Sequence, residues 1–220
     1  MITGVIMSAT LNSVPGDKRI KVYVAAAFAL ALVALMAFDT KVISLTELES
    51  EVGFSPQQFA QETFPEIQAY VENNAVNASV LAPEVLQDAG AAGEKYGVAA
   101  GIGYIVPVSL SGAAIEGRGG VYTLDVENVP SDVVIRVQTG PAINGTTLRD
   151  TTGTIQFGDF TNQIEYQDVG AALNDEMKRQ VLADISGQDL TGKTLEVVGS
   201  FTMINPKNWL ITPVSITIIE

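Results

Sequence analysis

The chain has 220 residues and a formal net charge of −13, with 47% hydrophobic and 17% charged residues, which excludes general disorder and leaves room for one domain beside an anchor. A body this acidic repels phosphate backbones, so we expect no nucleic-acid partner. Because histidine and cysteine are both absent, triad hydrolases, thiolate nucleophiles and the usual zinc sites are excluded, and we predict no enzyme activity, no metal and no cofactor.

Residues 22–38 read VYVAAAFALALVALMAF, without a charge or a proline. A run of roughly 17 apolar residues is close to the shortest that crosses a membrane. Basic residues cluster just before it, so residues 1–21 are predicted to be a cytoplasmic tail and the rest to lie outside. We expect a single-pass protein of a bacterial inner membrane with a periplasmic C-terminal domain. A cleaved signal segment is the first alternative, and a buried soluble helix is a more distant one.

Residues 39–98 are predicted to form a helical region. A helix begins around Ser55-Pro56-Gln57-Gln58, where the serine suits the cap and the proline suits the first helical position. Pro65 should kink or restart this helix. Apolar residues at helical spacing predict a second helix from Pro83 to Gly97.

Residues 99–220 are predicted to form a β-rich domain, because the apolar period changes to two after residue 97. One helix is expected from about 171 to 185. The order of elements predicts an α+β chain in which an N-terminal transmembrane helix and a short helical region precede an OB-like small β-barrel with one inserted helix. A β-sandwich with one helix is the alternative. Strands are expected at 106–110, 121–126, 133–137, 154–157, 164–169, 194–203 and 209–219.

Two central motifs stand out, TGPAINGTTLRD at 139–150 and FGDFTNQIEY at 157–166, followed by Leu173-Asn174. With these motifs the chain resembles an uncharacterised bacterial family of predicted periplasmic lipoproteins, a domain of unknown function. The similarity runs from the apolar segment to the C-terminus, and members tend to be encoded beside sugar ABC-transporter genes. Lipoproteins need a cysteine directly after the signal peptide; the chain has none, so the resemblance implies location and fold but no lipid anchor.

Some motif residues are of types that fix loops and fill cores, because Asn-Gly and Gly-Pro pairs shape turns and aromatic side chains are bulky and apolar. We predict a structural role for Gly140, Pro141, Gly145, Thr146, Phe157, Phe160 and Asn174.

Four motif residues are candidate ligand contacts: Arg149, Asp150, Asn162 and Gln163. A guanidinium fork binds carboxylates or phosphates or packs on a sugar ring, and amides beside aromatics are typical of carbohydrate sites. The competing interpretation is internal, with Arg149 paired to an acidic neighbour, Asp150 capping a turn and the amides satisfying backbone groups.

Our first functional hypothesis is a non-enzymatic, membrane-anchored, extracytoplasmic accessory protein of an ABC-type sugar uptake system. Its partners would be transporter subunits or the solute-binding protein. The alternative is a module that binds a small ligand, a sugar in the first instance. A carboxylate-dependent hydrolase is the third hypothesis, and only the abundance of Asp and Glu supports it.

Overall fold

The computed structural model describes residues 22–23, 26–32, 53–101 and 103–219. The chain divides into two units, Met1–Gly53 and Phe54–Glu220. In the first unit, residues 22–23 and 26–32 are helical. No helix in the described ranges is both long and apolar enough to cross a membrane. The remainder of the predicted span at 22–38, and all of the tail at 1–21, lie outside the described residues.

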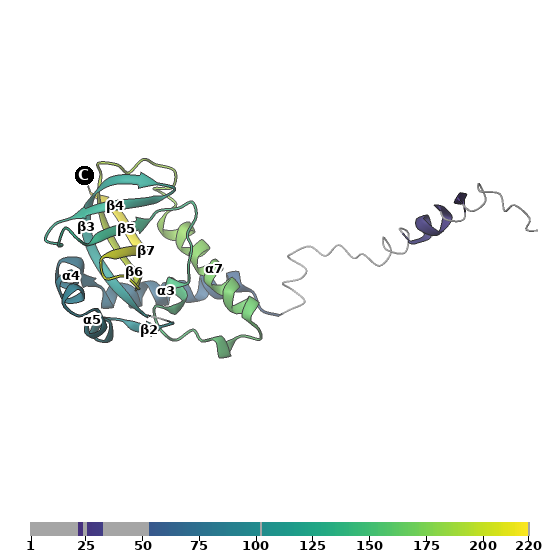
Figure 1. Cartoon of the computed structure of the whole chain (residues 1–220), viewed down its shortest axis with the longest axis horizontal. Helices are drawn as coiled ribbons and strands as arrows, with labels where there is room; N and C mark the ends of the chain where they lie inside the picture. The colour runs from purple at the N-terminus through teal and green to yellow at the C-terminus, as the bar shows by residue number, and fades with distance from the viewer. Residues whose placement is uncertain (1–21, 24–25, 33–52, 102, 220) are drawn as a thin grey trace, which may run out of the picture. The chain divides into compact units, whose positions relative to one another are not determined.

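The second unit is built on one sheet that closes into a barrel (Figure 1). The barrel strands follow the order β3-β4-β5-β7-β6, and β6 also pairs with β3, which completes the ring. Only the β5–β7 pair in this ring is parallel. This is the Greek-key order of an OB-fold, so the predicted OB-like barrel is confirmed and the sandwich alternative is wrong. The strands are β3 (Gly103–Arg118), β4 (Val121–Val126), β5 (Val134–Gln138), β6 (Thr194–Met203) and β7 (Asn208–Ile219).

Strand β3 is much longer than the predicted strand at 106–110 because it pairs with two neighbours along its length. Residues 104–113 pair with β6, and residues 112–118 pair with β4. The register to β4 shifts between Ala114 and Glu116, which marks a bulge. Bulges of this kind bend a strand and help a sheet to close.

Among the described residues of the second unit, three helices precede the barrel, together with short strands that pair with β3. The predicted cap at Ser55 is confirmed, since its hydroxyl accepts a hydrogen bond from the Gln58 N–H at 3.2 Å. The predicted restart at Pro65 is wrong: the helix continues, and because Pro65 is exposed, the carbonyl that loses its partner can face water. These elements are α3 (Pro56–Asn74), β1 (Val76–Asn77), α4 (Ala78–Gln87), α5 (Ala89–Tyr96) and β2 (Val98–Ala100).

The predicted second helix from Pro83 to Gly97 is two helices, with Pro83 inside α4 rather than at a helix start. The break is at Asp88, whose carboxylate accepts a hydrogen bond from the Ala91 N–H at 3.0 Å and so caps α5.

Helix α7 (Gln163–Val181) corrects the sequence prediction most strongly, because the expected strand at 164–169 is its first turns. The Asn162 side chain accepts hydrogen bonds from the N–H groups of Ile164 at 2.9 Å and Glu165 at 3.0 Å. The Glu165 carboxylate in turn accepts from the Thr161 N–H at 2.9 Å. These contacts satisfy donors that a helix start leaves free, and they fix the start at 163 rather than near 171.

The expected strand at 154–157 is also wrong, since this segment is irregular and leads into the short 3₁₀ helix η1 (Phe157–Asp159). A one-turn helix, α6 (Thr147–Asp150), precedes it inside the first motif.

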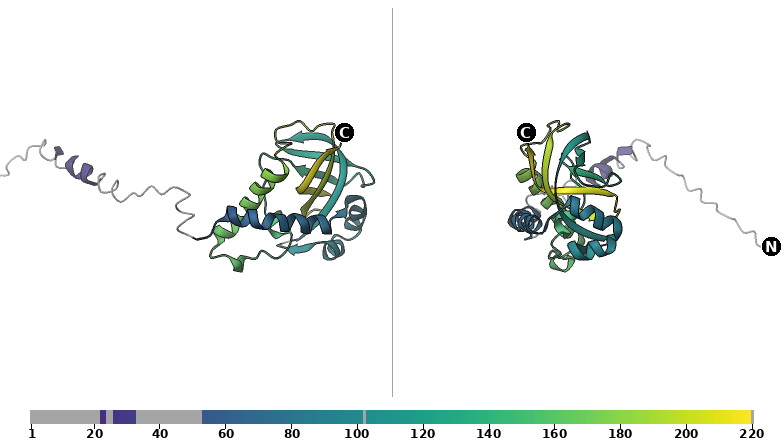
Figure 2. Two further views of the ribbon diagram at one scale, coloured as in Figure 1. Left: turned by 180° about the vertical axis from the view of Figure 1, so that it is seen from behind. Right: turned by 90° about the vertical axis from the view of Figure 1, so that its left-hand side faces the viewer.

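Helices α3 and α7 lie side by side against the barrel (Figures 1 and 2). The inner faces of both helices and the barrel interior contribute to a single hydrophobic core. Phe64 of α3 and Leu173 of α7 are fully buried in it. Trp209 is also fully buried and stacks on Phe201 with ring centroids 4.5 Å apart, so it is a core residue of the barrel.

Candidate functional site

The first motif follows β5 and ends in α6. A buried amide of α7 fixes its loop to that helix. Asn174 of α7 donates its side-chain N–H to the Gly145 carbonyl at 2.9 Å. Gly145 has φ +98, a conformation that favours glycine. Gly140, with φ +86, precedes a cis peptide bond to Pro141. These residues therefore define the shape of the loop and its distance from the helix.

Arg149 is buried, and its contacts are internal. Its Nε and Nη2 donate to the two carboxylate oxygens of Asp150 at 2.6 and 3.0 Å, and Nη1 donates to the Tyr166 carbonyl at 3.0 Å. The guanidinium carbon lies 3.6 Å from the centroid of the Tyr166 ring. Only 8% of the Arg149 side chain is exposed. The guanidinium thus connects α6 to α7 and already holds a carboxylate in its fork.

Asp150 accepts two further hydrogen bonds, from the Thr146 hydroxyl at 2.7 Å and from the Tyr166 phenol at 3.4 Å. Burial of the phenol, reinforced by the neighbouring Asp150 carboxylate, raises the pKa of Tyr166. The phenol therefore stays protonated at neutral pH and serves as a donor to Asp150.

The two candidate amides differ from one another. Asn162 caps α7 and also donates to the Glu165 carboxylate at 3.3 Å, whereas Gln163 is exposed and its side chain forms no hydrogen bond within the described ranges. Neither amide hydrogen-bonds to Arg149 or Asp150 in the part of the chain that is described. The structure therefore does not gather the four candidates around one ligand position.

The aromatic residues of the second motif pack beside this cluster. Phe160 contacts Phe54, Phe59 and Tyr166, with ring centroids 5.5 to 5.8 Å apart. Phe157 meets the Tyr166 ring edge-on at 5.7 Å and is 54% exposed. Between this pair and strand β2 lies an open depression of about 410 Å³, lined also by Arg149, Asp150 and Gln156.

A second surface lies on the outer side of β4, β5 and β7, where Thr123, Arg136 and Leu210 are register partners across the three strands. Arg136 donates from Nη2 to the Asn208 side chain at 2.6 Å. Its Nε is buried and has no acceptor among the described residues. The residue lines a depression of about 470 Å³ together with Arg118 and Leu210.

Sequence reasoning missed Arg136 because it is one polar residue in the run Val133-Val134-Ile135-Arg136-Val137. Alternation indicates only that such a residue faces away from the barrel interior. Whether that outer face is covered by another segment depends on the tertiary structure, and no local signal reveals it.

Comparisons with known proteins agree with this fold. The chain is similar to an OB-fold protein from Thermotoga maritima solved at 1.90 Å, with a TM-score of 0.60 and 18% identity over 76% of this chain and 99% of the other. At that identity the likeness shows the fold alone. No curated protein matches the sequence. The family described as "Predicted periplasmic lipoprotein (DUF2291)" matches residues 27–217, which supports an extracytoplasmic location. The chain belongs to this family of predicted periplasmic lipoproteins.

Proposed function

We propose that the protein is a non-enzymatic accessory protein of an ABC-type sugar uptake system. Residues 22–38 would hold it at the outer side of the inner membrane. The observation that carries the binding role is the open outer face of the barrel, where Arg136 has a buried donor without an acceptor in the described part of the chain. Family membership supports the location. The gene neighbourhood typical of the family that the motifs resemble supports the link to sugar uptake.

The motif residues do not support a catalytic role, because their polar groups already fix the structure. Arg149 and Asp150 pair with each other, and Glu165 caps α7. The Asp159 carboxylate accepts a hydrogen bond from the Gln156 N–H at 2.9 Å. A general acid or base needs a position from which it reaches a substrate, and these carboxylates are committed to backbone or guanidinium donors.

The test is crosslinking and co-purification of the full-length tagged protein from its native membranes, with partners identified by mass spectrometry. We expect a permease, an ATPase or a solute-binding subunit to be recovered. A tagged single-span protein of similar abundance is the control for nonspecific capture. Recovery of no transporter subunit beyond this control would refute the accessory role.

A second candidate function is binding of a small carbohydrate in the depression at Phe157. An exposed aromatic face next to the exposed Gln156 amide offers a stacking surface and a polar group of the kinds that sugars need. Calorimetry of the full-length protein against a panel of sugars tests this. We expect Phe157→Ala to abolish the heat of binding and Gln163→Ala to leave it unchanged. No heat with any sugar would exclude this function.

A further inference from the structure

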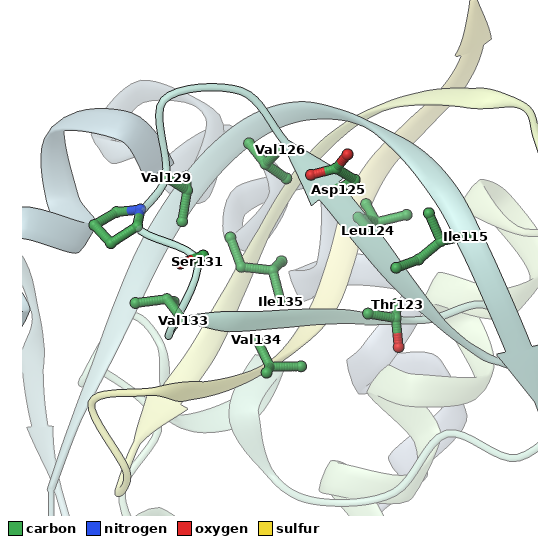
Figure 3. A pocket seen from close by; sticks show the side chains of 11 residues that line it. Ile115, Thr123, Leu124, Asp125, Val126, Val129, Ser131, Val133, Val134 and Ile135 are labelled. Carbon is green, nitrogen blue, oxygen red and sulfur yellow. The ribbon is translucent and has the colours of Figure 1, made fainter.

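An aliphatic hollow of about 230 Å³ lies at the ends of β4 and β5 (Figure 3). Thr123 lines both this hollow and the depression at Arg136. Side chains from the two strands and from the connection between them surround the hollow, with Ile115 of β3 beside Leu124. Ile115 is 55% exposed and Val134 is 43% exposed. The aliphatic side chains of the hollow are Ile115, Leu124, Val126, Val129, Val133, Val134 and Ile135.

The hollow exists because the β4–β5 ladder stops early. The last register pair is Leu124 with Ile135, and the chain between Val126 and Val134 leaves the sheet before it returns. On the other side, the bulge in β3 between Ala114 and Glu116 interrupts the pairing to β4. Both irregularities interrupt the ladders at the same place and leave Ile115 and Val134 exposed, whereas Leu124, Val133 and Ile135 of the same hollow remain buried.

The charges around this surface are not balanced internally. Among the described residues, the basic side chains in ion pairs are Lys95, Arg149, Lys178, Arg179 and Lys207. Within the described ranges, no carboxylate oxygen lies within 4.0 Å of a nitrogen of Arg118 or Arg136, although Glu116 and Asp125 line the same surface. A buried guanidinium donor without an acceptor costs free energy. The Nη2 of Arg136 lies at the surface, where an incoming carboxylate would pair with the guanidinium.

The lining residues distinguish between classes of ligand. None of the residues that line the two depressions is aromatic, whereas sugar rings pack on aromatic faces. Nucleic acid is disfavoured by the net charge of −13. An aliphatic hollow beside a guanidinium suits a polypeptide that presents an aliphatic side chain next to a carboxylate.

We propose that this surface binds a segment of a partner protein in which an aliphatic side chain enters the hollow and a neighbouring Asp or Glu pairs with Arg136. The proposal rests on the proposed function, because it specifies how an accessory protein contacts a subunit of the uptake system. It assigns the contact to the outer face of β4, β5 and β7 and not to the 139–166 motifs.

Site-specific photocrosslinking in the full-length protein in native membranes is the first part of the test. A photoreactive amino acid replaces Ile115 or Val134 on the proposed surface, or Ile164 at the exposed start of α7 as the matched control. We expect crosslinks to a transporter or solute-binding subunit from 115 and 134 but not from 164. The crosslinked segment should hold an Asp or Glu beside a Leu, Ile or Val.

The second part uses that segment as a labelled synthetic peptide, with binding to the full-length protein measured by fluorescence anisotropy. We expect Arg136→Gln to weaken binding at least about tenfold, because it removes one partner of a desolvated charge pair. Lys193→Gln removes the same charge elsewhere and should leave affinity unchanged. A peptide in which the acid is replaced by its amide should bind the native protein weakly. Arg136→Gln should lower the affinity for this peptide little further.

The outcomes separate the two proposals. Crosslinks to a subunit from 164 alone would overturn this surface and leave the accessory role standing. Absence of any uptake subunit at all three positions would overturn this surface, and absence from the co-purification as well would overturn both. A captured segment without a carboxylate, or equal effects of Arg136→Gln and Lys193→Gln, would overturn the proposed chemistry.

Discussion

Buried polar side chains connect segments that are far apart in the sequence. Besides Asn174, the Gln138 amide donates to the Thr212 hydroxyl at 2.9 Å and accepts from the Asn144 N–H at 3.3 Å. The Thr151 and Ser200 hydroxyls are 2.9 Å apart and buried. Each contact fixes the first motif or its flanks to α7, β6 or β7, so the motif is held by groups whose partners lie outside it.

Asn174→Ala tests this role at one residue. The substitution removes the hydrogen bond from the buried Asn174 amide to the Gly145 carbonyl, so we expect the free energy of unfolding to fall by about 0.5–1.5 kcal/mol. Urea denaturation followed by circular dichroism measures the change. Asn73→Ala, at an exposed position of α3, is the control and should change stability little. Equal effects of the two substitutions would contradict the role of Asn174.

Glu176 predicts a dependence of stability on pH. The hydrogen bond from the Arg179 guanidinium, followed by one from Gln180, lowers the pKa of this buried carboxyl. Because the folded-state pKa lies below the unfolded value of about 4.3, its contribution is full above that pH and is lost as the pH falls through the folded-state pKa. We therefore expect the stability difference between the native protein and Glu176→Gln to shrink on acidification.

Chemical denaturation at a series of pH values from neutral to acidic measures this difference. Glu94→Gln changes an exposed carboxylate and serves as the control. A difference for Glu176→Gln that stays constant with pH would argue against the ion pair as its source.

Among the elements, α7 begins where the sequence interpretation predicts a strand. The stretch Asn162-Gln163-Ile164-Glu165 has the spacing of a capping box, yet Ile164 and Tyr166 also alternate with polar residues as in a strand. Ile164 is 70% exposed, so the alternation does not mark a buried face. The cap therefore outweighs the short alternating pattern, and the helix begins there.

Asn162→Ala should destabilise the protein by about 0.5–2 kcal/mol, because it removes the acceptor for the Ile164 and Glu165 N–H groups. Thermal unfolding followed by circular dichroism gives the effect. Gln163→Ala, one residue later and exposed, should have little effect. If sugar binding is found, loss of binding by Asn162→Ala without loss of stability would instead favour a ligand contact.

At the scale of the whole molecule, residues 54–219 share one core in which the helices before the barrel and the barrel itself pack together. Trp209 is the single tryptophan of the chain and lies at the centre of this core against Phe201. Its fluorescence therefore reports on the barrel, whereas circular dichroism at helical wavelengths reports largely on α3 and α7.

A shared core predicts that both signals change together. We expect the Trp209 emission to shift to longer wavelength at the same urea concentration at which helical signal is lost, because neither part keeps its buried surface without the other. Separate midpoints would show that the helical region at 39–98 and the barrel at 99–220 unfold as two domains, as the sequence-based division of the chain predicts.

The sequence by itself determined the class of the fold and the family. Apolar residues at a period near two placed β4 at 121–126 and β6 at 194–203, and the order of several strands, one amphipathic helix and two closing strands indicated an OB-like barrel. These features are local, so a single sequence reveals them.

Only the tertiary structure decided which polar side chains have hydrogen-bond partners within the protein. Arg149 finds its acceptors in Asp150 and the Tyr166 carbonyl, whereas the Nε of Arg136 has no acceptor among the described residues. Burial of an arginine and contacts such as that of Arg149 with the Tyr166 carbonyl depend on distant segments of the chain, which no local pattern encodes.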